Sequence, residues 1–170
     1  MNYPPAYLIT FTTYGTWLHG DIRGSADTEH NEFGSKYLPE KTGMVNFERS
    51  KLQNDVVSLN EQQRELTLQS ILEVCNTRGW FAHIVHVLSD HVHAVVSARI
   101  EPEKIMTDFK RYATRALKEA GYNKVQKYWT RHGSTRYIWA NEKLNAVVTY
   151  VKVKQGRVMS LGCTKQSPEC

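Results

Sequence analysis

Two histidines separated by a single residue, His91 and His93, carry the clearest chemical signal in the sequence. They open a predicted strand at 91–98. Side chains alternate between the faces of a strand, so both imidazoles point to one face and Val92 to the other. Their Cα atoms then lie roughly 6.5 to 7 Å apart, which lets the two rings hold one divalent metal ion. Two histidines that are only solvated on an open sheet face would show the same spacing, so the pair alone leaves both interpretations open.

A tyrosine and an amide follow on and just after the last predicted helix, at 141–154. The apolar residues of that helix recur at positions i, i+3, i+4 and i+7, namely Leu144, Val147, Val148 and Val151. Tyr150 lies at the edge of this stripe. Gln155 returns to it at the helix end, where a buried amide needs a partner such as a metal ion or a phosphate-bound water. The alternative is a packing role for Tyr150 and a plain helix-end role for Gln155.

A basic and aromatic stretch occupies 110–136. It carries a net charge of +7, from eight basic residues and one acidic one: Lys110, Arg111, Arg115, Lys118, Lys124, Lys127, Arg131 and Arg136 against Glu119. Five aromatic residues lie within or beside it: Tyr112, Tyr122, Tyr128, Trp129 and Tyr137. Cations that meet phosphates and flat rings that stack on unpaired bases are typical of surfaces for single-stranded or hairpin nucleic acid. A solvated helix face with core aromatics is the alternative.

Composition bounds the class of protein. The 170 residues, 41% hydrophobic and 23% charged, indicate one globular domain rather than a disordered or collagen-like chain. No run approaches the roughly 18 apolar residues that a membrane span needs, and the first residues lack the pattern of a secretory signal. Three cysteines without metal-finger spacing indicate reduced thiols. We therefore expect a cytoplasmic protein.

The elements that must position these residues alternate along the chain. We expect strands at 6–14, 80–88, 91–98 and 135–139, and helices at 58–78, 102–120 and 141–154. The pair Ser58 and Glu61 predicts a capping box at the start of the first helix. His83 and His86 are three apart on one strand, so we expect them to face opposite sides, which means that both cannot join the histidine site. Packing or surface roles are expected for them.

Without the last helix, the order along the chain is strand, helix, strand, strand, helix, strand. This is the split β-α-β arrangement of ferredoxin-like α+β proteins. Helices are expected on one face of an antiparallel sheet, with the other face left free. We place one domain at 1–156, with a long loop insertion at 19–57 that is functional or mobile. The tail at 157–170 shows little pattern and is expected to be mobile.

Four segments in this order resemble the single-tyrosine HUH transposase family, which includes the small insertion-sequence transposases and the REP-associated tyrosine transposases. They are the motif Asp90-His91-Val92-His93 at a strand hairpin, the basic helix segment at 109–115, the connector at 129–136 and the late helix segment at 150–156. The segment at 13–20 also suits the REP-associated branch. The likeness covers most of 6–156.

The resemblance implies roles for individual residues. His91 and His93 become metal ligands for Mg²⁺ or Mn²⁺, and Tyr150, on the C-terminal helix, becomes the nucleophile. In better-known members the third ligand is an amide four residues after the tyrosine. Lys154 holds that position here and Gln155 comes one residue later, so the helix must unwind or bulge for Gln155 to act as ligand. Lys154 can instead contact DNA.

The function implied is that of a metal-dependent endonuclease and strand transferase that cuts hairpin-forming single-stranded DNA through a 5′-phosphotyrosine intermediate. The residues expected to contact DNA are Lys110, Arg111, Arg115, Lys118, Arg131, Arg136 and Lys154. The protein is expected to be a monomer or a homodimer. It is expected to associate with the bacterial nucleoid and not with a membrane. Three alternatives stay open: a non-catalytic ferredoxin-like nucleic-acid-binding protein, a recruited member that no longer moves an element, and a metal-dependent hydrolase in which water is the nucleophile.

Overall fold

The computed structural model describes residues 3–16, 52, 54–153 and 160–164. Its elements are β1 (Ala6–Thr12), α2 (Glu61–Arg78), β2 (Phe81–Val87), β3 (His91–Ser97), α3 (Pro102–Glu119), β4 (Ser134–Ile138), α4 (Asn141–Val153) and β5 (Ser160–Gly162). All strand pairs are antiparallel, in the order β4-β1-β3-β2-β5. The predicted α+β fold with a ferredoxin-like sheet is confirmed. Most of the 19–57 segment lies outside the described residues.

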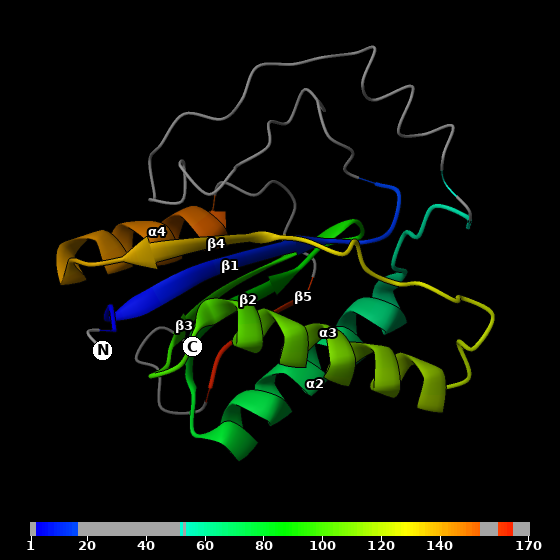
Figure 1. Cartoon of the computed structure of the whole chain (residues 1–170), viewed down its shortest axis with the longest axis horizontal. Helices are drawn as coiled ribbons and strands as arrows, with labels where there is room; N and C mark the ends of the chain where they lie inside the picture. The colour runs from blue at the N-terminus through cyan, green and yellow to red at the C-terminus, as the bar shows by residue number, and fades with distance from the viewer. Residues whose placement is uncertain (1–2, 17–51, 53, 154–159, 165–170) are drawn as a thin grey trace, which may run out of the picture.

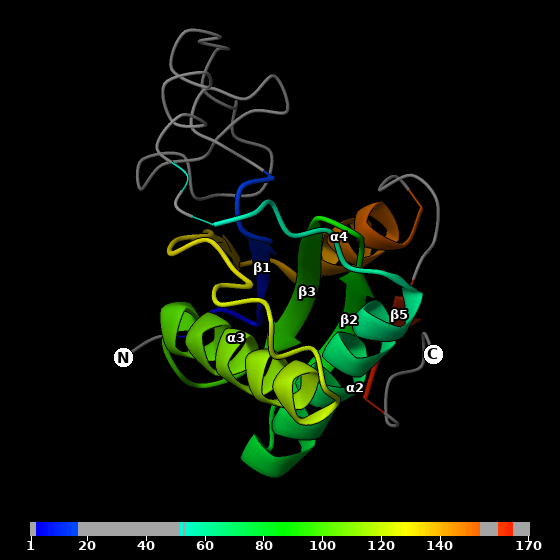
Figure 2. The same cartoon turned by 90° about the vertical axis from the view of Figure 1, so that its right-hand side faces the viewer.

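The sheet separates two apolar layers. Along β1, the side chains of Tyr7, Ile9 and Phe11 join the larger core under α2 and α3, while Ala6 and Leu8 join a smaller core under α4. This alternation follows from the two-residue period of a strand. Figures 1 and 2 show α2 and α3 side by side on one face of the sheet and α4 on the other. The face expected to be free is therefore partly covered by α4.

The start of α2 differs from the prediction by two residues. Asn60 is the N-cap, and its side chain and that of Gln63 form the reciprocal capping box. Ser58 is not the cap because Leu59, which follows it, is almost fully buried and its N–H donates to the carbonyl of Ser89 in the β2–β3 turn. The helix ends at Gly79 as predicted, with a φ of 67° that favours glycine.

Replacing Asn60 by Ala is expected to lower the free energy of unfolding by about 1 kcal/mol, because the backbone N–H of Gln63 loses its acceptor, the Asn60 side-chain oxygen. Ser58→Ala is the matched control and is expected to change stability by less than about 0.5 kcal/mol. Urea denaturation of both variants measures the difference. Equal losses in the two variants would contradict the assignment of the cap.

The C-terminal tail is not without structure. Its residues 160–162 form β5, which pairs with residues 85–87 of β2. Three residues are too few to show a strand period in the sequence, and the pairing depends on the unpaired backbone of β2. Cys75 is a buried free thiol, and burial raises its pKa to about 12. Cys163, by contrast, takes part in a disulfide, so the expectation of three reduced thiols was wrong.

None of the helices among the described residues combines the length and apolar composition that crossing a membrane requires.

Candidate functional site

The two histidines of the motif lie side by side on the face of the sheet that α4 partly covers. Val92, between them, is in the core under α2 and α3, and Val95, two residues after His93, packs in the core under α4. The ring centroids of His91 and His93 are 4.7 Å apart, and the ring planes meet at 81°. The prediction that both imidazoles share one face is confirmed.

Each imidazole is oriented by a second polar side chain. The Nδ1 of His91 lies 2.6 Å from a carboxylate oxygen of Asp90, and the Nδ1 of His93 lies 2.7 Å from the hydroxyl of Thr10. A carboxylate that accepts from Nδ1–H selects the tautomer whose Nε2 carries the lone pair. Both Nε2 atoms are buried. Nε2 is therefore the atom that His91 can offer to a metal ion, and in His93 the Nδ1 is likewise engaged, by the hydroxyl of Thr10.

The imidazole nitrogens of His91 and His93 fit a metal site that takes a third ligand from another segment. Among the described residues no three His, Cys, Asp or Glu side chains gather into a metal-binding cluster. Gln155, the amide expected to complete the set, lies outside the described residues, as does Lys154. Imidazole nitrogen suits Zn²⁺ better than Mg²⁺ or Mn²⁺, so the two rings alone do not select the expected ions. The metal therefore stays a prediction that the orientation of the two rings supports.

A third histidine, His86, lies beside the pair. It is fully buried, and its Cα is the register partner of that of His93 across β2 and β3. A bulge between Ala82 and Ile84 interrupts the alternation of β2, and the Nε2 of His83 lies 2.8 Å from the hydroxyl of Ser97, on the same face as His93. The expectation that His83 and His86 face opposite sides was wrong, because that argument assumed a regular strand.

The position of His86 could have been found from the sequence. A two-residue turn at 89–90 makes residue 86 the partner of residue 93, since the turn sets the register of a hairpin. Thr10 carried no such local signal, because its place beside His93 depends on how β1 pairs with β3.

The last turn of α4 meets this row of histidines. The Nδ1 of His86 lies 3.2 Å from the backbone carbonyl oxygen of Val151. Burial lowers the pKa of His86, so its imidazole is neutral, and Nδ1 carries the hydrogen because a carbonyl only accepts. Tyr150, one residue before Val151, is half-buried and packs against the core under α4. The structure thus brings the segment that carries Tyr150 to the face that carries His91 and His93.

Three segments meet at the end of the sheet where His91 lies: 12–16, 88–91 and 128–132. We call them the hairpin corner. The hydroxyls of Thr12 and Thr130 are 3.0 Å apart, and the backbone N–H and hydroxyl of Thr13 both donate to the carbonyl of Asp90. Thr12 is the register partner of His91. The connector between α3 and β4 is therefore fastened next to the histidine pair.

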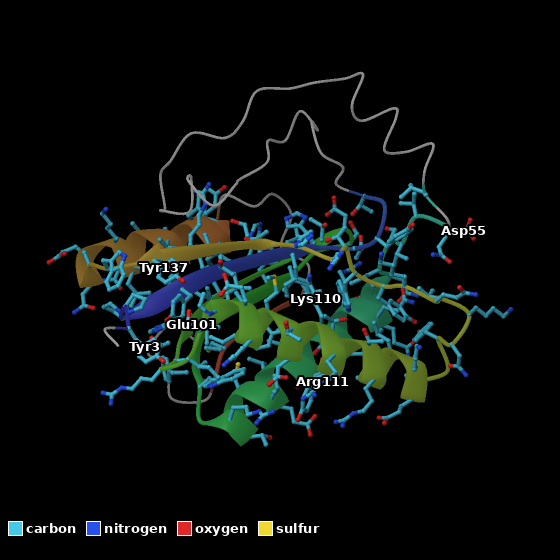
Figure 3. The ribbon with its side chains drawn as sticks, in the orientation of Figure 1. Tyr3, Asp55, Glu101, Lys110, Arg111 and Tyr137 are labelled. Carbon is cyan, nitrogen blue, oxygen red and sulfur yellow. The ribbon has the colours of Figure 1, made fainter. Side chains whose placement is uncertain are left out.

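Lys110 holds the connector in place. Its Nζ donates to the carbonyls of Thr130, Arg131 and His132 at 2.9, 3.3 and 3.1 Å. Burial lowers the pKa of Lys110 to about 8. Figure 3 places Lys110 between α3 and the sheet, whereas Arg111 lies on the outer side of the same helix. Contact of Lys110 with DNA stays a prediction, but its ammonium group already donates hydrogen bonds to three carbonyls of the connector.

The other basic residues expected to contact DNA divide into separate groups. Arg111, Arg115 and Lys118 are exposed on α3, on the side of the sheet opposite the histidines, where Arg111 also pairs with Asp108 at 3.0 Å. Arg136 is only 5% exposed. Arg131 is exposed at the hairpin corner. The structure thus brings Arg131 to the histidine end of the sheet and keeps the α3 cations away from it.

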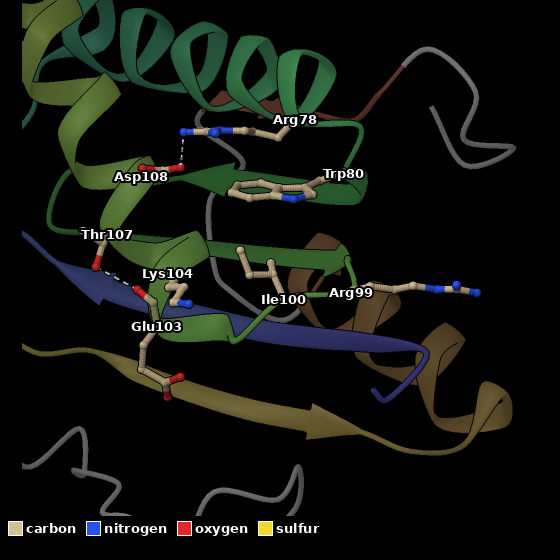
Figure 4. Close-up of a pocket in the computed structure, with 8 residues that line it drawn as sticks. All are labelled: Arg78, Trp80, Arg99, Ile100, Glu103, Lys104, Thr107 and Asp108. Atoms are coloured by element: carbon tan, nitrogen blue, oxygen red, sulfur yellow. Dashed lines mark hydrogen bonds and ion pairs between the residues drawn. The ribbon is translucent and has the colours of Figure 1, made fainter. Parts of the chain in front are cut away.

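A groove of about 610 Å³ lies elsewhere, between the end of α2 and the start of α3 (Figure 4). It is lined by Trp80 and by charged residues that include Arg99 and Lys104. These residues lie near the start of β2 and the end of β3, whereas the histidine pair lies at the other end of this hairpin. None of the predicted site residues lines the groove.

Fold and site together define a class: an α+β protein with a ferredoxin-like antiparallel sheet and two oriented imidazoles facing a helix that carries a tyrosine. A family model described as "Transposase IS200 like" matches residues 49–154. The chain therefore belongs to the IS200-like transposase family. The match includes His91, His93 and Tyr150 and stops one residue before Gln155.

One solved structure agrees with this fold. The structure of a REP-associated tyrosine transposase bound to a REP hairpin matches with a TM-score of 0.54 and 13% identity, over 91% of this chain and 70% of that one. A protein from Deinococcus radiodurans, provisionally described as a transposase, matches with a TM-score of 0.48 and 11% identity, over 89% of this chain and 92% of its own. No curated protein matches the sequence.

Proposed function

We propose that this transposase cuts and rejoins single-stranded DNA with Tyr150 as nucleophile, at a divalent metal site built on His91 and His93. The observation that carries the proposal is the contact between His86, beside His93, and Val151, beside Tyr150, at 3.2 Å. It joins the tyrosine helix to the imidazole pair across the sheet. A nucleic-acid-binding module without catalysis would have no need for that arrangement.

The reaction follows from the chemistry of these residues. The oxygen of the Tyr150 hydroxyl attacks phosphorus, a P–O bond to tyrosine forms, and the bond between phosphorus and the 3′ oxygen breaks. The phenol gives up its proton to solvent, and the leaving oxygen takes one to become a 3′-hydroxyl. A divalent ion, when bound, would polarise a phosphate oxygen and orient the scissile bond. The 5′-phosphotyrosine keeps the bond energy, so a second 3′-hydroxyl can reverse the step without ATP.

The site's own residues supply orientation. Asp90 and Thr10 hold the two imidazoles with Nε2 directed away from the carboxylate and the hydroxyl. The core under α4 packs the helix of Tyr150 onto the sheet. Fixing the nucleophile and the phosphate-binding group on rigid elements is the main way that an enzyme lowers the entropy cost of such a reaction.

The substrate that we propose is DNA that folds back into a hairpin. A structure similar to this one holds a REP hairpin. The exposed Arg131 belongs to the hairpin corner, and the exposed Lys127 lies next to it. The Nζ of Lys127 also lies over the ring of Tyr14, 4.9 Å from its centroid. A hairpin that contacts this corner leaves its single strand beside the imidazoles.

A denaturing gel tests the proposal. The full-length protein is incubated with a labelled single-stranded hairpin oligonucleotide and Mn²⁺, and a labelled band at the mass of protein plus DNA is expected, absent when EDTA is added. Binding without such a band would support the non-catalytic module. Metal-dependent cleavage without a covalent band would support hydrolysis by water.

The hairpin corner predicts how binding depends on salt. Replacing Lys127 and Arg131 together by Gln is expected to make the negative slope of log K against log salt concentration less steep by about 2. Each lost phosphate contact removes about 0.9 from its magnitude. Arg111→Gln with Arg115→Gln, on the far side of α3, is the matched control and is expected to leave the slope unchanged. Fluorescence anisotropy at several salt concentrations measures both. A less steep slope for the Arg111→Gln, Arg115→Gln variant alone would place the DNA on the opposite side of the sheet.

A further inference from the structure

One buried contact joins the tyrosine helix to the sheet by hydrogen bonding. His86 is fully buried, and its Nδ1–H donates to the carbonyl oxygen of Val151 at 3.2 Å. The apolar contacts of α4 come from Val147, Val148 and Val151, which pack in the smaller core with Leu8 and other aliphatic side chains of the sheet. Apolar packing is non-directional. The hydrogen bond adds a direction that such packing lacks.

The acceptor belongs to the last turn of α4 that the structure describes, since α4 spans Asn141–Val153. Because a hydrogen bond is directional, a donor on the sheet at this place sets where that turn lies on the sheet. Tyr150 belongs to that turn.

The donor is tied to the imidazole pair. His86 and His93 are register partners on adjacent strands, so their Cβ atoms leave the sheet side by side. His93 is in turn oriented by Thr10 on the next strand. One row across the sheet therefore contains Thr10, His93 and His86, and it ends on the backbone of the tyrosine helix.

We infer that His86 is a positioning residue, which locks the last turn of α4 onto the sheet and so sets the place of Tyr150 relative to His91 and His93. The inference rests on the proposed function. His86 is not a further metal ligand in this account, because the described residues hold no cluster of three metal-binding side chains of the His, Cys, Asp or Glu type. Its Nδ1 is occupied by the carbonyl of Val151.

Two substitutions separate the hydrogen bond from the ring. His86→Leu introduces an apolar side chain of similar size and removes the donor, whereas His86→Asn keeps an N–H at a reach similar to that of Nδ1. His83→Leu, the same change three residues earlier on β2, is the matched control. Thermal unfolding of each variant, followed by circular dichroism, checks that it is folded.

The first measurement is the single-turnover rate of covalent adduct formation with saturating hairpin DNA and Mn²⁺. We expect His86→Leu to lower the rate by about 10- to 100-fold, the range that a misplaced reacting group produces, while the Kd for hairpin DNA and the Mn²⁺ concentration at half-maximal rate change by less than about twofold. His86→Asn and His83→Leu are expected to stay close to wild type.

The second measurement is hydrogen exchange of the α4 amides in the protein without DNA. Exchange in α4 is expected to be faster in His86→Leu and unchanged in His86→Asn, with α2 and α3 unaffected in both. Unchanged rate and exchange in His86→Leu would overturn the inference, as would equal impairment of the Asn variant or a raised Mn²⁺ requirement. If wild type forms no adduct, the proposed function fails, and the exchange measurement still decides whether His86 holds α4.

Discussion

Replacing Tyr150 by Phe is expected to abolish the covalent adduct with hairpin DNA and to leave hairpin binding within about twofold of wild type. The substitution removes one oxygen and keeps the ring, which packs against the core under α4, so folding and the DNA surface should persist. Removing the nucleophile of a covalent mechanism lowers the rate by a factor on the order of 10⁴ or more. The denaturing gel gives the adduct, and fluorescence anisotropy gives the Kd.

Tyr112→Phe is the control for this experiment. Tyr112 also lies on a helix among basic residues, with the guanidinium groups of Arg111 and Arg115 at 5.4 and 4.8 Å from its ring centroid. It is on α3, across the sheet from the histidines, and we expect its variant to form the adduct at the wild-type rate. An adduct that persists in Tyr150→Phe would show that another residue is the nucleophile, which peptide mapping of the labelled complex would identify.

Removing both imidazoles is expected to have the second-largest effect. His91→Ala combined with His93→Ala should eliminate adduct formation at every Mn²⁺ concentration, because both imidazoles proposed to hold the ion are removed. Hairpin binding should change little, since the cations at the hairpin corner remain. Adduct yield is measured against Mn²⁺ concentration, with His83→Ala as a control that removes an imidazole elsewhere on the same face.

Asp90→Asn refines this test. The Asp90 carboxylate lies 2.6 Å from the Nδ1 of His91, and losing a group that orients a metal-binding histidine lowers metal affinity by about 10- to 100-fold. The variant should therefore recover adduct formation when the Mn²⁺ concentration is raised, whereas the double alanine variant should not. An Asp90→Asn protein with the wild-type Mn²⁺ requirement would argue against His91 as a ligand.

Much of the local structure was predictable because its causes are local. The spacing of His91 and His93 placed both on one face, since a strand has a period of two residues. Gly79 marked the end of α2, because few other residues adopt its left-handed backbone. The order of elements gave the ferredoxin-like sheet. The roles proposed for Tyr150 and Gln155 depended on the family resemblance and stay predictions.

What only the tertiary structure decided depends on pairing between distant segments. The charge pattern showed that α3 has an exposed basic face, yet it could not show that α2 and α3 lie across the sheet from the histidines. The pairing of β1 with β3 brought Thr10 to His93, and packing of α4 on the second face brought Val151 to His86. Periodicity tells which side of an element is buried, but not which other element buries it, because that choice minimises exposed apolar area over the whole chain.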